Sequence, residues 1–256
     1  MTTVYLITGA SKGIGRATVL NALRYNNGRV VAVARNEILL NELQSTAKKM
    51  GFGEDRLLIV PGDICNKQTV STAVQAAVAK WGKLDAVIAN AGILEPVSLV
   101  ENTTLEDWQT LFNVNLFSIV DLAKESLPYL RKTRGTLILV SSGAAVKGYT
   151  GWGCYGASKA ALNHLGMTLG VEEQEVATLC IRPGVVDTDM QVVIRSKGRE
   201  AMKDDAQKFI DLHENGQLLS PDQPGKLLAA LGAHPMHERS GQFLSWDDPA
   251  LESCRK

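Results

Sequence analysis

The sequence has no excess of charge of either sign and no long apolar run. Lysine plus arginine and aspartate plus glutamate number 27 each in 256 residues, so no net charge draws the chain to a polyanion or to an anionic membrane surface. We therefore expect no binding to nucleic acid. No apolar run approaches the roughly 20 residues of a membrane-spanning helix, and we expect no association with a membrane.

Cysteine is also scarce. The four cysteines, Cys65, Cys154, Cys180 and Cys254, contain no C-x-x-C pair, which is typical of reduced thiols in the cytoplasm rather than of disulfides or a zinc site. The first residues lead at once into an apolar stretch without a basic segment, so we predict no secretion signal. The histidines have no carboxylate or cysteine arranged with them as metal ligands. A cytoplasmic protein without a bound metal is expected.

What the sequence does contain is a regular alternation of short apolar runs and helical periodicity. Strands are predicted at 4–8, 30–34, 57–60, 84–89, 136–141, 178–181 and 242–245, and helices lie between them, with a break predicted at Pro128. The strands are apolar at almost every position, as expected when helices cover both faces of a parallel sheet. The sequence therefore predicts one α/β domain over residues 1–256, built on a doubly wound parallel sheet.

Residues 187–219 depart from this alternation, because they form a long, charged and weakly periodic stretch after a strand end. Ligands bind at such strand ends in open parallel sheets. A surface helical insertion is one interpretation. We favour the other, a mobile flap over a substrate, because long insertions in compact domains are often lids.

The first strand ends in a glycine-rich turn, Thr8 to Gly15, that precedes a helix. Its G-x-x-x-G-x-G spacing lets the backbone approach a pyrophosphate, and the helix N-terminus offers unpaired N–H groups and the positive end of its dipole. Glycines before a helix can also be simple turn residues. Because this turn opens a series of alternating strands and helices, we predict that it binds a dinucleotide. The predicted contacts are Gly9, Ser11, Lys12, Gly13, Ile14 and Gly15.

The residue after the second strand indicates which nicotinamide cofactor is used. An acidic residue there would bind the adenosine ribose and repel a 2′-phosphate, but this chain has Arg35. Lys12 in the glycine turn adds a second cation that could reach the same phosphate. Two solvated surface cations are the alternative interpretation. We predict NADP(H) in preference to NAD(H).

Tyr155 and Lys159 are four residues apart, which places them on one face of a helix. A nearby ammonium lowers the pKa of a phenol and makes it a usable proton donor. The spacing also occurs by chance in many surface helices. Whether the spacing indicates a catalytic pair therefore depends on which residues the rest of the chain places around it.

Taken in order, several short patterns resemble the classical short-chain dehydrogenase/reductases. They are the Thr8–Gly15 turn, Asp63, Asn90-Ala91-Gly92, Asn115, Ser142, Tyr155 with Lys159, and Pro183-Gly184. The resemblance implies a Rossmann-type sheet of about seven parallel strands and an NAD(P) cofactor. It also implies a catalytic tetrad of Asn115, Ser142, Tyr155 and Lys159.

The resemblance implies a role for each of these residues. Tyr155 gives a proton to a carbonyl oxygen that Ser142 holds, Lys159 also reaches the nicotinamide ribose, and Asn115 holds a water that relays protons. Further cofactor contacts are implied at Asp63, Ile64, Asn90, Ala91, Gly92, Tyr155, Lys159, Pro183, Gly184, Val186 and Thr188. Asp63 could equally cap the helix that follows it.

The substrate is less closely defined. Residues 155–164, 187–191 and 240–249 resemble the sepiapterin reductase-like subgroup, especially its fungal benzil reductases. Ser245 stands near the position of the pterin-anchoring aspartate, with Asp247 and Asp248 slightly later, so benzil and other α-diketones are favoured over a pterin. Trp152 and Val185 are candidate contacts for a small or aromatic ketone, although an aromatic residue in a loop can simply fill the core.

Three alternatives remain open at this point. They are sepiapterin reduction, NAD-linked oxidation of an alcohol or steroid, and an NADP-sensing binding protein without turnover. The complete tetrad argues against the last. The resemblance also implies a homodimer or homotetramer, paired through the helices that carry Asn115 and Tyr155.

Overall fold

The computed structural model describes residues 2–255, and they form one seven-stranded sheet in which every neighbouring pair of strands is parallel. The order of the strands is β3-β2-β1-β4-β5-β6-β7, so the direction of winding reverses between β1 and β4. The strands are β1 (Val4–Thr8), β2 (Arg29–Ala34), β3 (Leu57–Pro61), β4 (Ala86–Ala89), β5 (Thr136–Val140), β6 (Ala177–Arg182) and β7 (Phe243–Ser245). The predicted doubly wound α/β fold is confirmed, with each strand present near its predicted position.

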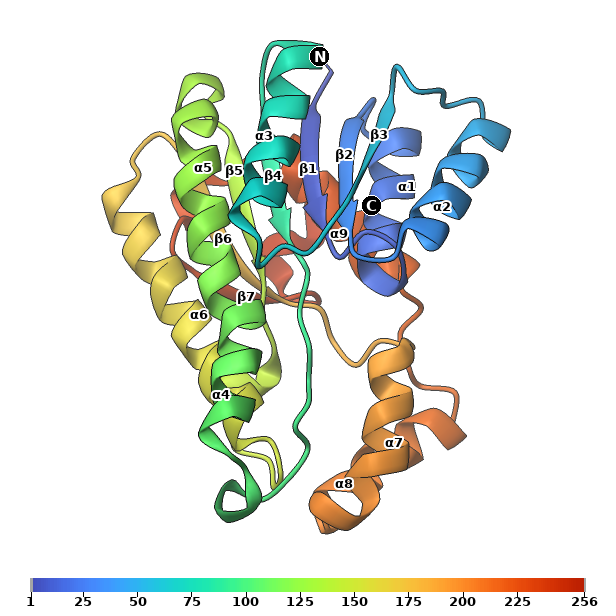
Figure 1. Cartoon of the computed structure of the whole chain (residues 1–256), viewed down its shortest axis with the longest axis vertical. Helices are drawn as coiled ribbons and strands as arrows, with labels where there is room; N and C mark the ends of the chain where they lie inside the picture. The colour runs from blue at the N-terminus through green and yellow to red at the C-terminus, as the bar shows by residue number, and fades with distance from the viewer. Residues whose placement is uncertain (1, 256) are drawn as a thin grey trace.

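Helices cover both faces of the sheet (Figure 1). They are α1 (Gly13–Tyr25), α2 (Glu37–Lys49), α3 (Lys67–Trp81), α4 (Leu105–Phe112), α5 (Ser118–Thr133), α6 (Gly153–Glu172), α7 (Asp189–Ala201), α8 (Asp204–Glu214), α9 (Asp222–Ala233) and α10 (Glu252–Arg255). A π-helical turn, η2 (Asn113–Phe117), joins α4 to α5, and short 3-10 turns occur at η1 (Val100–Asn102), η3 (Gly143–Ala145), η4 (His237–Arg239) and η5 (Pro249–Leu251).

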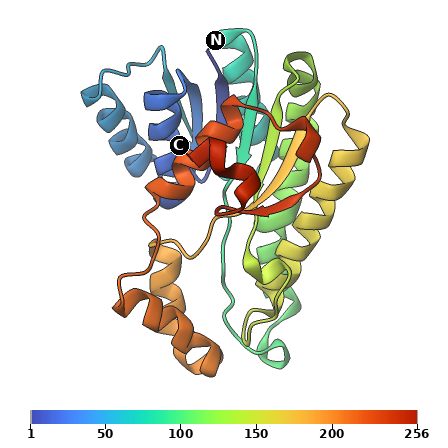
Figure 2. The same ribbon diagram turned by 180° about the vertical axis from the view of Figure 1, so that it is seen from behind.

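Two apolar layers hold the sheet between its helices. One face packs against α1, α2 and α9, and the other packs against α3, α5 and α6. Figure 2 shows α9 and the C-terminal segment lying across the back of the sheet. Strands β1 and β4 are buried at every position, which explains why their sequences are apolar without alternation. Within residues 2–255, no helix combines the length and apolar character needed to cross a bilayer.

Pro128 does not break its helix as the sequence predicted, because α5 continues to Thr133. The ring of a proline in a helix leaves one carbonyl oxygen without its usual N–H partner. Pro128 and Lys124, one turn before it, are both exposed, so water can satisfy that carbonyl. The buried side chains Leu127 and Leu130 keep the helix against the sheet.

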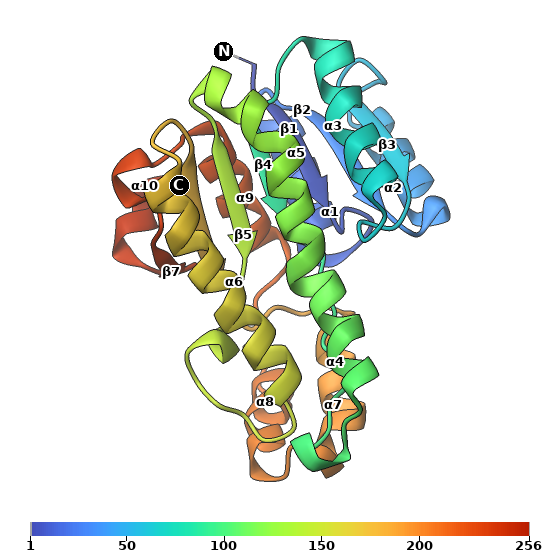
Figure 3. The same cartoon turned by 60° about the vertical axis from the view of Figure 1, so that its left-hand side comes forward.

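The segment 187–219 forms two helices, α7 and α8, that pack together beyond the carboxyl ends of the strands (Figure 3). Its apolar side chains Ile194, Met202 and Phe209 belong to a third buried cluster that also contains Trp152 and Tyr155. The weak periodicity in the sequence reflects helices that bury only one narrow face. The structure thus places this helical pair where the sequence placed the predicted flap.

Candidate active site

A cavity of about 1050 Å³ opens at the carboxyl ends of the strands. Its walls include the segments that follow β1 and β4, the strands between which the winding reverses, and ligands bind at such points in doubly wound sheets. Typical small-molecule pockets measure about 300 to 1,000 Å³, so this one has room for a dinucleotide. The predicted cofactor residues that line it are Gly9, Ser11, Lys12, Gly13, Ile14, Arg35, Asp63, Ile64, Asn90, Ala91, Gly92, Tyr155, Lys159, Pro183 and Thr188.

Three predicted cofactor residues lie outside these walls. Gly15 does not line the cavity, and a Cβ atom added to it would overlap the carbonyl oxygen of Gly9. Gly184 lines a neighbouring cavity, and Val186 pairs with Leu219 in an isolated bridge. Gly15 thus shapes the turn through close packing and does not face the ligand space.

The glycine turn leaves an open helix N-terminus toward the cavity. Gly9 and Gly13 have φ angles of 64° and 52°, in the left-handed region that favours glycine. Lys12, the residue that precedes α1, makes no capping hydrogen bond with its side chain. The first N–H groups of α1 are therefore free of a side-chain cap, as a pyrophosphate site requires. This cradle fits the predicted dinucleotide.

Asn90 fixes the relative positions of the first and fourth strand ends. Its Nδ2 donates to the carbonyl oxygen of Thr8 at 2.9 Å, and its backbone N–H donates to the Thr8 hydroxyl at 3.1 Å. The Thr8 hydroxyl also accepts from the Ala91 N–H at 3.0 Å. These bonds hold the floor of the cavity in one shape.

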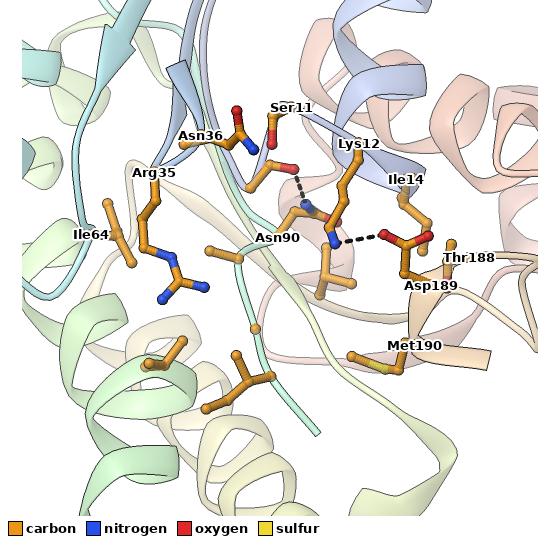
Figure 4. Close-up of a pocket in the computed structure, with 18 of the residues that line it drawn as sticks. Ser11, Lys12, Ile14, Arg35, Asn36, Ile64, Asn90, Thr188, Asp189 and Met190 are labelled. Carbon is orange, nitrogen blue, oxygen red and sulfur yellow. Dashed lines mark hydrogen bonds and ion pairs between the residues drawn. The ribbon is translucent and has the colours of Figure 1, made fainter. Parts of the chain in front are cut away.

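Arg35 and Lys12 extend into different parts of the cavity (Figure 4). The ammonium of Lys12 forms an ion pair with Asp189, with Nζ and Oδ2 2.6 Å apart. The sequence predicted that Lys12 joins Arg35 at a single phosphate. In the structure Lys12 is paired with a carboxylate on α7 instead, a contact between distant segments that no local pattern predicts.

Tyr155 and Lys159 stand on one face of α6, as their spacing predicts, and both are buried. Burial raises the pKa of Tyr155, and a hydrogen bond with the Ser142 side chain lowers it by less. Burial also lowers the pKa of Lys159 to about 8. The sequence predicted a lowered pKa for Tyr155, but desolvation is the larger effect and the net shift is upward. Tyr155 keeps its proton at neutral pH.

Asn115 lies in the π-helical turn η2, and its side chain is buried. Its Oδ1 accepts from the Ile93 N–H at 2.8 Å, and its Nδ2 donates to the Ile93 carbonyl at 2.9 Å and to the Ser158 hydroxyl at 3.2 Å. Single π-helical turns often occur at functional sites. Asn115 thus joins the loop after β4 to the helix that carries Tyr155.

The apolar side chains that line the cavity include Met190 and Val193, from the segment predicted as a flap, and three residues that sequence reasoning missed, Ile93, Leu94 and Val114. Two of these residues directly follow Asn90-Ala91-Gly92, and one directly precedes Asn115. Their positions beside motif residues were the available signal, but in the sequence they were indistinguishable from core residues.

Trp152 lies outside the cavity walls and is 6% exposed. Its ring is 5.7 Å from that of Tyr155, edge to face, and 5.2 Å from that of Phe209 on α8. It therefore connects the tyrosine to the helical pair. Its contact with a substrate stays a prediction.

Val185, the other candidate substrate contact, lines a second cavity of about 380 Å³ with Ser245 and Asp247. A hydrogen bond with Ser245 and the positive charges of Arg182 and Arg255 lower the pKa of Asp247. The carboxylate is thus ionised, but cations of the protein already face it.

A parallel sheet with a phosphate-type glycine cradle at its switch point defines a dinucleotide-binding protein of Rossmann type. The family model described as short chain dehydrogenase matches residues 3–199. The chain therefore belongs to the short-chain dehydrogenase family and is an oxidoreductase, and the family uses NAD(P)(H).

Relatives and solved structures agree with this assignment. The chain is 43% identical over 252 residues to an uncharacterised oxidoreductase of Saccharomyces cerevisiae, and the alignment covers 97% of each chain. It is 40% identical over 260 residues to a benzil reductase, (S)-benzoin forming, of the same organism, again with 97% of each covered. The crystal structure of the KRED1-Pglu enzyme superposes with a TM-score of 0.89 at 41% identity and covers 94% of this chain and 100% of its own.

Proposed function

We propose that this protein uses NADPH to reduce small or aromatic ketones, with α-diketones such as benzil as favoured substrates. The observation that carries the proposal is the buried phenol of Tyr155, which lines the cofactor-sized cavity and keeps its proton at neutral pH. A carbonyl reduction needs a proton donor in that state. The open glycine turn and Arg35 support a phosphorylated dinucleotide in the rest of the cavity.

Each residue of the tetrad has a role in the proposed reaction. The bound cofactor supplies the hydride that reaches the carbonyl carbon. Ser142 donates a hydrogen bond to the carbonyl oxygen as negative charge develops there, and Tyr155 transfers its phenolic proton to that oxygen. The nearby charge of Lys159 favours the phenolate that remains. Asn115 keeps the Ile93 segment and Ser158 in place beside them.

The proposed substrate class rests on two observations. The cavity near Tyr155 has apolar walls, which suit the aromatic or alkyl groups of a ketone. The 40% identical relative is a benzil reductase. A pterin is less suited, because Arg182 and Arg255 already balance the charge of Asp247 near the last strand. We also propose that residues 187–219, as α7 and α8, close over the substrate.

The experiment that tests the function is NADPH consumption with benzil and diacetyl, followed by absorbance. We expect turnover by the unmodified protein and a loss of at least about a hundredfold in Tyr155→Phe, because only the proton donor is removed. Tyr149→Phe is the matched control: this tyrosine packs against Trp152 but does not line the cavity, and activity should persist. Binding of NADPH without turnover on a broad carbonyl panel would instead support an NADP-sensing protein.

Two further proposals concern the cellular location and the oligomeric state of the protein. We propose action in the cytoplasm, supported by four free cysteines and by a 40% identical structure described as a cytoplasmic protein of Saccharomyces cerevisiae. We also propose a homodimer or homotetramer. The exposed apolar side chains of Leu105 on α4 and Phe117 in η2 support this, because burial against a second copy would remove them from water.

A further inference from the structure

The Lys12–Asp189 ion pair bridges two parts of the cavity wall. Lys12 belongs to the glycine turn before α1, and Asp189 is the first residue of α7 (Figure 4). Their charged atoms are 2.6 Å apart, and both side chains are mostly exposed, at 63% and 73%. Exposed pairs of this kind are weak, worth at most about a fivefold change in an equilibrium. A doubly charged phosphate can therefore compete with Asp189 for the ammonium.

Both partners can separate at low cost. The lysine ammonium sits on a flexible stem of four carbons, so Lys12 can turn within the cavity that Arg35 also lines. The carboxylate of Asp189 stands in the first turn of α7, where the positive end of the helix dipole stabilises it without a lysine. The pair is thus a weak, exchangeable contact at the cofactor site.

We propose that Asp189 is a specificity-determining residue that limits the preference for a 2′-phosphorylated cofactor by holding Lys12 away from the phosphate. The proposal rests on the proposed use of NADPH. Binding of the 2′-phosphate transfers the Lys12 ammonium from the carboxylate to the phosphate, and it detaches the start of α7 from the glycine turn. By linkage, the ion pair weakens phosphate binding by the same factor as phosphate binding weakens the ion pair.

A second ion pair provides the matched control. Lys197 on α7 pairs with Glu95 in the loop after β4, so this contact also ties α7 to the body of the protein. It involves neither Lys12 nor Arg35. Removing it by Glu95→Gln loosens α7 without freeing a cation near the glycine turn.

The experiment is calorimetric titration with two probes, adenosine 2′,5′-bisphosphate and 5′-AMP, which differ only in the 2′-phosphate. We expect Asp189→Asn to tighten the bisphosphate about threefold and to leave 5′-AMP unchanged. Lys12→Met should abolish that gain in the double variant. Glu95→Gln should not change the ratio of the two affinities. Hydrogen exchange of the α7 amides in the unmodified protein should accelerate with the bisphosphate but not with 5′-AMP.

Other outcomes separate this proposal from the proposed cofactor. The role of Asp189 would be overturned by any of three results for Asp189→Asn: a gain in bisphosphate affinity that persists in the Lys12→Met background, equal gains in affinity for both probes, or no gain in affinity. An unmodified protein that binds both probes equally, while Asp189→Asn gains a preference for the bisphosphate, would contradict the NADPH preference and retain the role of Asp189.

Discussion

The ammonium of Lys159 lies 5.9 Å from the centre of the Tyr155 ring and donates a 2.9 Å hydrogen bond to the carbonyl oxygen of Val140. Both side chains are buried, at 4% and 6% exposure. Burial of a charge is costly, and the lowered pKa of Lys159, about 8, measures that cost. The site therefore keeps a cation beside a protonated phenol at the expense of stability.

Replacing Lys159 with methionine is expected to stabilise the protein at pH 7. The pKa falls from 10.5 to about 8 on folding, which corresponds to about 3 kcal/mol of destabilisation wherever both states are protonated. The lost hydrogen bond to Val140 offsets about 1 kcal/mol, leaving a gain of about 2 kcal/mol. Urea unfolding at pH 7 measures the difference.

The same variant has a defined pH dependence. Between pH 8 and 10.5 the folded protein releases the Lys159 proton while the unfolded chain retains it, so the unmodified protein regains stability as the pH rises. The difference in the free energy of unfolding between Lys159→Met and the unmodified protein should therefore be smaller at pH 9.5 than at pH 7. An advantage that grew with pH would contradict the assignment of a lowered pKa to Lys159.

Asn115→Ala is expected to lower the free energy of unfolding by about 2 to 4 kcal/mol. The change removes three hydrogen bonds and leaves the N–H and carbonyl groups of Ile93 without their partner. Asn113→Ala in the same π-helical turn is the control, because Asn113 is exposed, and it should cost less than about 1 kcal/mol. Urea unfolding compares the two, and equal losses would argue against the Ile93 contact.

Arg35→Asp is expected to reverse the proposed cofactor preference. The aspartate would accept hydrogen bonds from the adenosine ribose and repel a 2′-phosphate, which should change the ratio of kcat/KM values for NADPH and NADH by about a hundredfold. Arg24→Asp makes the same charge change outside the cavity and should leave the ratio unaltered. Equal use of both cofactors by the unmodified protein would refute the preference itself.

Local pattern was enough to predict the sheet and the glycine turn. Strands such as β1 and β4 are buried on both faces, so their sequences are uniformly apolar and easily recognised. The turn was predictable because three closely spaced glycines follow the first strand where the next helix begins, which is typical of a dinucleotide-binding turn. The spacing of Tyr155 and Lys159 predicted that they share a face of α6, since helix geometry alone decides this.

Contacts between distant segments were not readable from the sequence. Lys12 and Asp189 are 177 residues apart, and only the fold brings the start of α7 to the glycine turn. The sequence also gave the wrong direction for the pKa of Tyr155, because desolvation depends on everything packed around the phenol. Thus the sequence by itself determined the strands, the turn and the spacing of the catalytic residues, which depend on local chemistry. The tertiary structure alone decided which charges meet and how deeply the phenol and the ammonium are buried.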